Sequence, residues 1–237
     1  MNQQPPHSTQ PDQPLPRLNK YIALQLGVSR READDLIRSG RVEVNGKPAE
    51  LGQRVTDATV ISVSGTPLNA ASVAYEYIAL NKPVGYVSSR RQQGDSPTIY
   101  ELLPDRLHKL KPVGRLDRDS SGILLLTNDG DFAQSMTHPK FYKTKRYEIK
   151  LDRPLEPLHQ QMISDFGVHL PDGPSRFSVS RLDSAQEYEV IMHEGRNRQI
   201  RRTFDALGYT VIGLHRTDFG AYRLGGLKPG AFETITP

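Results

Sequence analysis

The sequence lacks cysteine altogether, and it contains no long apolar run. Without thiols the chain can form no disulfide and no thiolate zinc site, and a cysteine nucleophile is excluded. No apolar stretch approaches the roughly 18 residues that cross a membrane as a helix. The amino terminus also lacks the charged region and apolar core of a secretory signal. These absences predict a cytoplasmic protein that does not enter a membrane.

Motifs of cofactor and metal chemistry are missing as well. The chain has neither a Gly-x-x-x-x-Gly-Lys-Ser/Thr phosphate loop nor a Gly-x-Gly-x-x-Gly dinucleotide fingerprint. Its seven histidines are scattered without a His-x-x-x-His pair, so no metal site is expected. Ser120 and Ser121 have no histidine in a recognisable nucleophile elbow. What remains as candidate machinery is a carboxylate, a tyrosine and an arginine.

Positive charge is moderate in total but concentrated in two places. The net charge is +4 and the pI about 9.2. Between Arg17 and Lys47 there are seven basic residues and four acidic ones. Arg196–Arg202 contains four arginines in seven positions. Two separate basic patches are typical of a protein that binds a polyanion, although charged runs also occur as ordinary solvated faces.

Composition divides the chain into four segments. Residues 1–16 hold five prolines among glutamines without apolar periodicity, which predicts a disordered tail. Residues 17–64 carry helix and hairpin signals, and residues 65–74 are small and polar, as expected for a linker. The remaining residues, 75–237, are long enough for a catalytic domain. No signal for an oligomer is present, so a monomer is the expectation.

The segment 17–64 predicts two short helices and a hairpin. Apolar residues at four-residue spacing from Leu18 predict a helix that ends at Gly27. Ser29 and Glu32 form a capping box at the start of a second helix. Further on, alternating valines lead into an Asn-Gly pair, the favoured two-residue hairpin turn, and more strand is expected from Val55 to Val63.

Three stretches of this segment together resemble the alpha-L RNA-binding motif, a module named after a small-subunit ribosomal protein. They read Arg-Leu-Asn-Lys-Tyr-Ile-Ala, Ser-Arg-Arg-Glu-Ala-Asp and Gly-Arg-Val-Glu-Val-Asn-Gly-Lys. The resemblance implies that two helices and the following loop present basic side chains to structured RNA. The side chains concerned are Arg17, Lys20, Arg30, Arg31 and Arg41. The alternative is a helical hairpin with solvated arginines.

The stretch from Lys111 to Gly130 presents a carboxylate beside a core. A polar loop bracketed by Gly114 and Gly122 runs into the apolar sequence of residues 123–126, which predicts a buried strand. Asp117 lies at the centre of that loop. A carboxylate on a loop anchored by a strand is held more rigidly than one in a tail, and we predict that Asp117 is catalytic.

Two further elements carry candidate residues. The alternation of residues 145–151 predicts a half-buried strand that points Tyr147 inward, either as a core residue or as a functional one. After Gly195 a helix is expected in which Ile200 and Phe204 face the core. Arg201 falls at the boundary of core and solvent, where a guanidinium needs a carboxylate partner. That partner is Asp117 or any other nearby acid.

Four motifs in this order resemble the bacterial ribosomal-RNA pseudouridine synthases of the RsuA type. They are Leu-Asn-Lys-Pro-Val-Gly at 80–85, Gly-Arg-Leu-Asp-x-Asp-Ser-x-Gly at 114–122, Lys-Arg-Tyr at 145–147 and Gly-Arg-Asn-Arg-Gln-Ile-Arg at 195–201. The resemblance implies an α+β protein in which the alpha-L domain precedes a catalytic domain with a mainly antiparallel mixed central sheet flanked by helices. It assigns Asp117 as the catalytic aspartate, Tyr147 as the aromatic that stacks on the target base and Arg201 as the basic partner of the aspartate.

The implied reaction is the isomerisation of uridine to pseudouridine in ribosomal RNA, with no cofactor and no metal. The substrate would be ribosomal RNA or a pre-ribosomal particle, with a slight lean to the large subunit from the motif wording. Asp117 could attack C1′ or remove a proton from C2′. Further RNA contacts are predicted from four arginines: Arg115, Arg196, Arg198 and Arg202. The alternative is a non-catalytic RNA-binding or ribosome-assembly factor on the same fold.

Overall fold

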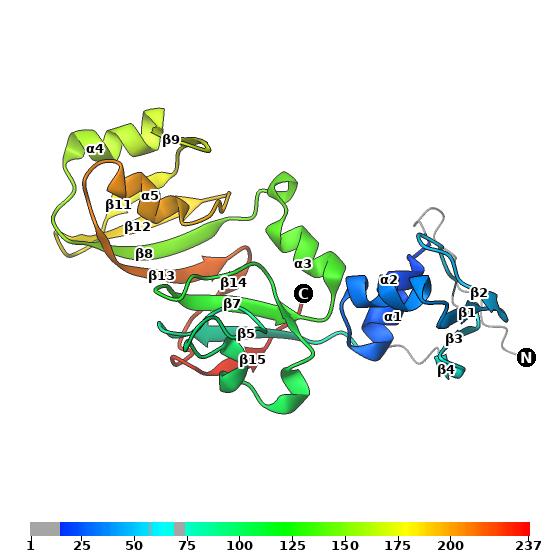
Figure 1. The fold of residues 1–237 in the computed structure, drawn as a ribbon. Coiled ribbons are helices and arrows are strands. Elements are labelled where there is room, and N and C mark those ends of the chain that lie inside the picture. The colour runs from blue at the N-terminus through cyan, green and yellow to red at the C-terminus, as the bar shows by residue number, and fades with distance from the viewer. Residues whose placement is uncertain (1–14, 57, 69–73) are drawn as a thin grey trace, which may run out of the picture. The chain divides into compact units, whose positions relative to one another are not determined.

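The computed structural model describes residues 15–56, 58–68 and 74–237, and it divides the chain into two units at Ala74 and Tyr75 (Figure 1). The predicted tail lies outside the described residues except for its last two positions. Half of the predicted linker, residues 69–73, also lies outside them. Its described part includes Thr66–Leu68, which forms strand β4 of the first unit. No helix among the described residues is long and apolar enough to cross a membrane.

The two helices of the first unit begin and end as the sequence predicts. Helix α1 spans Leu18–Leu26 and stops at Gly27, which takes the left-handed conformation at φ 68°. Helix α2 spans Arg30–Arg38, and the Ser29 and Glu32 side chains form both hydrogen bonds of the capping box. The caps satisfy backbone groups that would otherwise lack partners at the helix ends.

A small antiparallel sheet in the order β2-β1-β3-β4 completes this unit. Its strands are β1 (Val42–Val44), β2 (Lys47–Pro48), β3 (Ile61–Val63) and β4 (Thr66–Leu68). The predicted Asn-Gly turn joins β1 to β2, with φ 52° and 74° at its two residues. The expected strand at Val55 and Val60 was wrong. Val55 is buried but lies outside any strand, and Val60 is largely exposed. Strand β3 begins only at Ile61.

The second unit is built on a mixed sheet in the order β11-β12-β8-β13-β7-β5-β15. Neighbours are antiparallel except β13 and β7, which are parallel. The strands of this path are β5 (Tyr77–Lys82), β7 (Ser121–Thr127), β8 (Lys145–Leu151), β11 (Ser178–Arg181), β12 (Glu187–Met192), β13 (Val211–Phe219) and β15 (Phe232–Thr234). Two short strands lie off this path: β6 (Lys111–Pro112) pairs with β7, and β14 (Tyr222–Arg223) pairs with β13. The predicted fold class is therefore confirmed.

Short helices and one hairpin surround the sheet. The α-helices are α3 (Gly130–Thr137), α4 (Pro157–Gln161) and α5 (Gln199–Asp205), and α4 continues into the π-helical turn η4 (Met162–Phe166). Three 3₁₀ turns are η1 (Ile99–Leu102), η2 (Asp105–Leu107) and η3 (Pro139–Phe141), and the hairpin joins β9 (Val168–Leu170) to β10 (Gly173–Ser175). The sequence did not predict α3. The sequence Asn-Asp-Gly at 128–130 is typical of a turn, but here it starts this helix, and the Asp129 carboxylate caps the first turn.

Strand β7 is buried on both faces, which explains its uninterrupted apolar run. Leu124 and Leu126 belong to the cluster that includes Phe204 of α5, whereas Ile123 and Leu125 belong to the cluster that includes Met136 of α3. Alternate residues of a strand point to opposite faces, so buried side chains cover β7 on both sides, and α3 lies against one of them. The loop that precedes β7 is thus attached to the most buried strand of the unit.

Candidate active site

Asp117 lies on the loop between β6 and β7, and a buried lysine holds that loop in place. Lys82, the last residue of β5, donates from Nζ to the carbonyl oxygens of Asp117 at 3.0 Å, Ser120 at 2.7 Å and Pro83 at 3.0 Å. Burial lowers the pKa of Lys82 to about 8, against the opposing charges of Asp117 and Asp119. Three carbonyls fixed by one ammonium restrict the backbone around Asp117.

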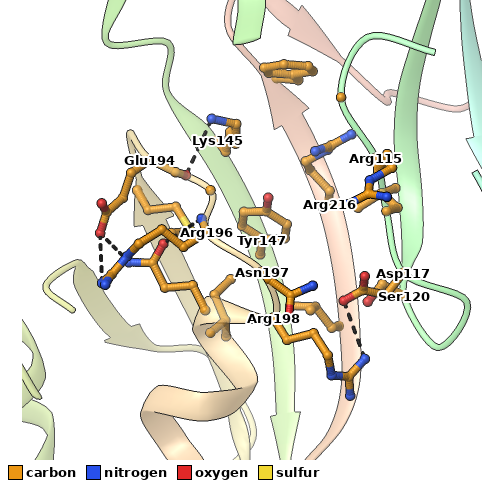
Figure 2. Close-up of a pocket in the computed structure, with 18 of the residues that line it drawn as sticks. Arg115, Asp117, Ser120, Lys145, Tyr147, Glu194, Arg196, Asn197, Arg198 and Arg216 are labelled. Atoms are coloured by element: carbon orange, nitrogen blue, oxygen red, sulfur yellow. Dashed lines mark hydrogen bonds and ion pairs between the residues drawn. The ribbon is translucent and has the colours of Figure 1, made fainter. Parts of the chain in front are cut away.

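The loop opens into a pocket of about 450 Å³ that gathers residues from distant parts of the chain. Asp117, Tyr147 and Arg201, the three residues predicted to form the site, all line it. Figure 2 shows Tyr147 on β8 in the middle of the pocket, with Asp117 on the β7 side and Arg198 reaching toward it. Asp117, Tyr147 and Arg201 lie more than 25 positions from one another in the sequence, and only the fold of this unit brings them together.

The direct partner of Asp117 is Arg198. Its Nη1 lies 3.4 Å from Oδ2 of Asp117, and the same guanidinium binds both carboxylate oxygens of Asp119 at 3.1 and 3.0 Å. On a regular helix that turns Ile200 and Phe204 to the core, Arg198 would point away from it. Instead it precedes α5 in the left-handed conformation, at φ 45° and ψ 34°, which turns its side chain toward the carboxylates.

Arg201 pairs with Asp119 in place of the Asp117 that we expected. Its Nε lies 3.3 Å from Oδ2 of Asp119, and its Nη2 and Nη1 donate to the carbonyls of Asp119 and Val211 at 2.8 and 2.5 Å. The prediction that this boundary position needs a carboxylate was therefore correct. The pattern left this carboxylate open, because loop residues two positions apart cannot be told apart by helical periodicity, and the structure shows Asp119 where the resemblance implied Asp117.

Asp119 links the two arginines beside Asp117. Burial acts to raise its pKa, but the hydrogen bond from Arg198 and the charges of Arg201 and Arg198 outweigh that effect. The pKa of Asp119 is thus below its ordinary value, and the residue is ionised at neutral pH. A charged carboxylate between two guanidinium groups fixes their positions relative to Asp117.

Tyr147 is a core residue that also lines the pocket, and a functional role for it stays a prediction. It is only 7% exposed and belongs to the main core cluster, and it also forms part of the pocket wall. In the sheet it lies directly opposite Arg216 of β13. A ring anchored in this way presents a fixed surface to whatever enters the pocket.

The remaining predicted RNA-binding arginines of this unit differ in whether they already pair with a carboxylate. Arg115 is exposed at the pocket. Arg196 and Arg202 both bind Asp172 in the turn of the β9–β10 hairpin, at 3.1 and 2.7 Å. Their guanidinium groups hold the hairpin in the free protein, so a phosphate would have to compete with Asp172 for them. RNA binding by these residues stays a prediction.

The basic residues of the first unit lie on or beside its helices. Arg17 precedes α1, and Arg31 is exposed at the start of α2. Arg30 donates to the side-chain oxygen of Asn19 at 3.2 Å, and Arg41 donates to Ser39 Oγ at 2.9 Å. Lys20, on α1, is half-buried. Neutral partners leave the charge of Arg30 and Arg41 available for an anion.

Sequence reasoning overlooked two cations that line the pocket, Lys145 and Arg216. Lys145 stood in the quoted Lys-Arg-Tyr motif, but only its tyrosine was given a role. Arg216 lies in a strand whose residues carry no distinctive pattern, and it is 2% exposed. Among the described residues, no group of three or more His, Asp or Glu side chains is placed to hold a metal ion.

The pocket is large enough for a nucleotide, and it holds a fixed carboxylate, an anchored ring and several arginines. These features are those of an enzyme active site, and the basic surface of the pocket suits a nucleic acid. The sequence model of the RNA pseudouridylate synthases matches residues 76–206, and that of the S4 domain matches residues 16–61. The first match covers more than half of the chain, so the chain belongs to the RNA pseudouridylate synthase family and is an isomerase. The S4 match agrees with the resemblance to the alpha-L motif.

Known relatives extend over nearly the whole chain. The ribosomal large subunit pseudouridine synthase B of Bacillus subtilis is 36% identical over 94% of this chain and 93% of its own length. The ribosomal small subunit pseudouridine synthase A of Pasteurella multocida is 37% identical over 93% of this chain and 96% of its own. A crystal structure of a pseudouridylate synthase superposes with a TM-score of 0.67 at 33% identity, covering 93% of this chain and 96% of that one.

Proposed function

We propose that this enzyme converts a specific uridine of ribosomal RNA to pseudouridine, with Asp117 as the catalytic carboxylate. The observation that supports this most strongly is the pocket in which Asp117, Tyr147 and the arginines Arg198 and Arg201 meet. Its volume of about 450 Å³ lies in the range of small-molecule sites and suits one nucleotide. Both relatives described above are named for a ribosomal subunit.

The reaction makes few chemical demands, and the pocket supplies them. The bond from C1′ to N1 of uridine breaks, the base turns over, C5 bonds to C1′, the hydrogen of C5 leaves as a proton, and the freed N1 takes up a proton. The Asp117 carboxylate either attacks C1′ or removes a proton from C2′, and carboxylates serve similar centres in glycosidases. Arg198 pairs with this carboxylate and orients it, while Lys82 fixes the loop that carries it.

The uridine must leave its stack to reach Asp117. Flipping a base costs a few kcal/mol, and enzymes offset that cost by stacking the base on an aromatic or apolar side chain. Tyr147 offers such a surface, and its burial in the core keeps the ring in place. We propose that the target base stacks on Tyr147 while Asp117 acts on the ribose.

The first unit, with its S4 domain at residues 16–61, would supply affinity for structured RNA. Its exposed arginines at the start of α2 and after Gly40 suit phosphate groups, which position an RNA without reading its sequence. We propose residues 17–64 as the RNA-binding domain and residues 75–237 as the catalytic domain. Large-subunit RNA is our first choice of target, on the wording of the motifs at 17–22 and 79–85.

Two measurements test the proposal. Recombinant enzyme should release tritium from ribosomal RNA that carries uridine labelled at C5, because the C5 hydrogen is lost in the isomerisation. Carbodiimide-dependent primer-extension stops should disappear at one position in a strain that lacks the gene. The position of the missing stop identifies the subunit. If all stops are retained in both ribosomal RNAs, ribosomal RNA is not the substrate.

Substitution of Tyr147 separates stacking from hydroxyl chemistry. Tyr147→Phe should retain most of the tritium-release rate, because the ring face is unchanged. Tyr147→Leu should lose about 10- to 100-fold, since base–aromatic stacking contributes roughly 1–3 kcal/mol. Single-turnover rates on the same RNA measure both variants. A Tyr147→Phe variant as slow as Tyr147→Leu would assign the main role to the hydroxyl.

Removal of arginines from the first unit should change the salt dependence of RNA binding. For the double variant Arg31→Gln, Arg41→Gln, the slope of log affinity against log salt should fall by about 0.7–0.9 for each phosphate that the variant no longer binds. Filter binding of ribosomal RNA over a range of salt concentrations measures the slope. Arg181→Gln, an exposed arginine of the second unit without an assigned role, is the control. An unchanged slope in the double variant contradicts the role of this unit.

A further inference from the structure

Two cations in the pocket wall have only neutral hydrogen-bond acceptors. Lys145 donates from Nζ to the carbonyls of His193 at 3.5 Å and Glu194 at 3.4 Å. Arg216 donates from Nε and Nη2 to the carbonyl of Ile123 at 2.9 and 2.7 Å. Within the part of the chain that the structure describes, neither side chain forms an ion pair with a carboxylate. Their positive charges are therefore not neutralised by the protein.

The two charges are also desolvated and close enough to repel each other. Burial lowers the pKa of Lys145, and the positive charge of Arg216 lowers it further, against the opposing effect of Glu194. Both cations lie near the ring of Phe219, at 5.5 Å from the centroid for Lys145 and 4.8 Å for Arg216. An aromatic face compensates only a small part of the cost of burying a charge. Such a pair is stabilised most by an anion that enters between or beside its members.

Three other arginines of the pocket already have anionic partners. Arg198 and Arg201 bind Asp119, and Arg196 binds Asp172. A phosphate that approached them would have to displace a carboxylate. Lys145 and Arg216 require no such exchange, and exposed Arg115 lines the same pocket (Figure 2). The most favourable place for an anion inside the pocket is thus the part of its wall formed by β8 and β13.

We propose that Lys145 and Arg216 bind a phosphate group of the nucleotide that is isomerised. The inference rests on the proposed function, because the ligand is the flipped uridine and the phosphate that enters with it. Tyr147 lies two residues after Lys145 on β8 and opposite Arg216, so base and phosphate would be held by neighbouring side chains. A phosphate fixed here anchors the ribose at Asp117 while the detached base turns over.

Binding of mononucleotides tests the site without any activity. Uridine, uridine 5′-monophosphate and uridine 3′-monophosphate should be titrated into the full-length protein by NMR. One of the two monophosphates should bind at least about tenfold more tightly than uridine, as expected for hydrogen bonds to a charged group. Which one binds identifies the phosphate. If neither binds more tightly than uridine, including the case in which none of the three binds, the proposal is overturned.

Two lysines of the same strand provide the variant and its control. Lys145→Met, which removes the ammonium but keeps most of the stem, should abolish the preference for the monophosphate, and Lys145→Arg should restore it. Lys150→Met should retain the preference, because Lys150 pairs with Glu187 outside this pocket. A preference that survives in Lys145→Met excludes Lys145 from the site. The remaining outcome is that only Lys145→Met abolishes the preference but the wild-type enzyme is inactive on ribosomal RNA. That result would support the phosphate site and reject the proposed substrate.

A modified substrate tests the same interaction during catalysis. RNA with a neutral methylphosphonate at the assigned phosphate of the target uridine should react with wild-type enzyme about tenfold more slowly. Lys145→Met should show the same loss on ordinary RNA and little further loss on the modified RNA, since the ammonium that binds the phosphate is already absent. Independent, additive losses would overturn the proposal.

Discussion

Asp117→Asn should lower pseudouridine formation by more than about 10³-fold, because an amide is neither a nucleophile toward C1′ nor a base for the C2′ proton. The substitution keeps the size of the side chain, and the Lys82 hydrogen bond to the backbone of residue 117 is unaffected. Affinity for ribosomal RNA should therefore stay close to that of the wild type. Tritium release from C5-labelled RNA and filter binding measure the two effects on one protein preparation.

A charge-matched control separates this effect from a change in net charge. Asp183→Asn removes a carboxylate that is exposed in the loop between β11 and β12 and does not line the pocket, so its activity should equal that of the wild type. Full activity of Asp117→Asn would refute the mechanism. Loss of RNA binding together with activity would instead indicate that the substitution disturbs the fold, and a thermal melt distinguishes these outcomes.

Of the glycine-to-alanine substitutions in this chain, Gly122→Ala should destabilise the fold most. Gly122 lies on β7 with φ 107°, a region that other residues rarely adopt, and it pairs with Arg216 of the parallel strand β13. A Cβ built there would lie 2.1 Å from the carbonyl oxygen and 2.5 Å from the nitrogen of Arg216. The clash is with backbone, so one of the two strands has to move. We expect a loss of about 3–5 kcal/mol in the free energy of unfolding.

Urea unfolding followed by circular dichroism measures this loss. Gly226→Ala is the matched control, because no heavy atom lies within 4 Å of its added methyl group and its φ is not in the positive range. That variant should unfold at the wild-type urea concentration or slightly above it. A Gly122→Ala variant with an unchanged midpoint would show that β7 and β13 are not held in this close pairing.

Local sequence rules worked where a short stretch satisfies its own hydrogen bonds. The Ser29 and Glu32 capping box, the stop at Gly27 and the Asn-Gly hairpin all formed as predicted, because each depends on residues within four positions. The alternation of β8 likewise gave the inward direction of Tyr147. The same rules missed α3, where a capping signal and a turn signal share the sequence Asn-Asp-Gly, and only packing of Met136 against β7 distinguishes them.

The functional pairs depend on backbone conformation that periodicity does not specify. A left-handed residue before α5 turns Arg198 toward Asp117, and Arg201 then meets Asp119. The cations Lys145 and Arg216 become neighbours only because β8 and β13 are adjacent in the sheet. Long-range strand pairing decides these interactions, and it joins residues more than 60 positions apart.

The sequence by itself determined the class of this protein: an RNA-binding unit ahead of an α+β pseudouridine synthase unit, with Asp117 on a loop before a buried strand. These features follow from local motifs. The residue types and spacing of those motifs are required for turns, helix caps and strand pairs. The tertiary structure alone decided which charges meet. Ion pairs depend on distances of a few ångströms between elements, and those distances are set by strand order and packing rather than by any stretch of sequence.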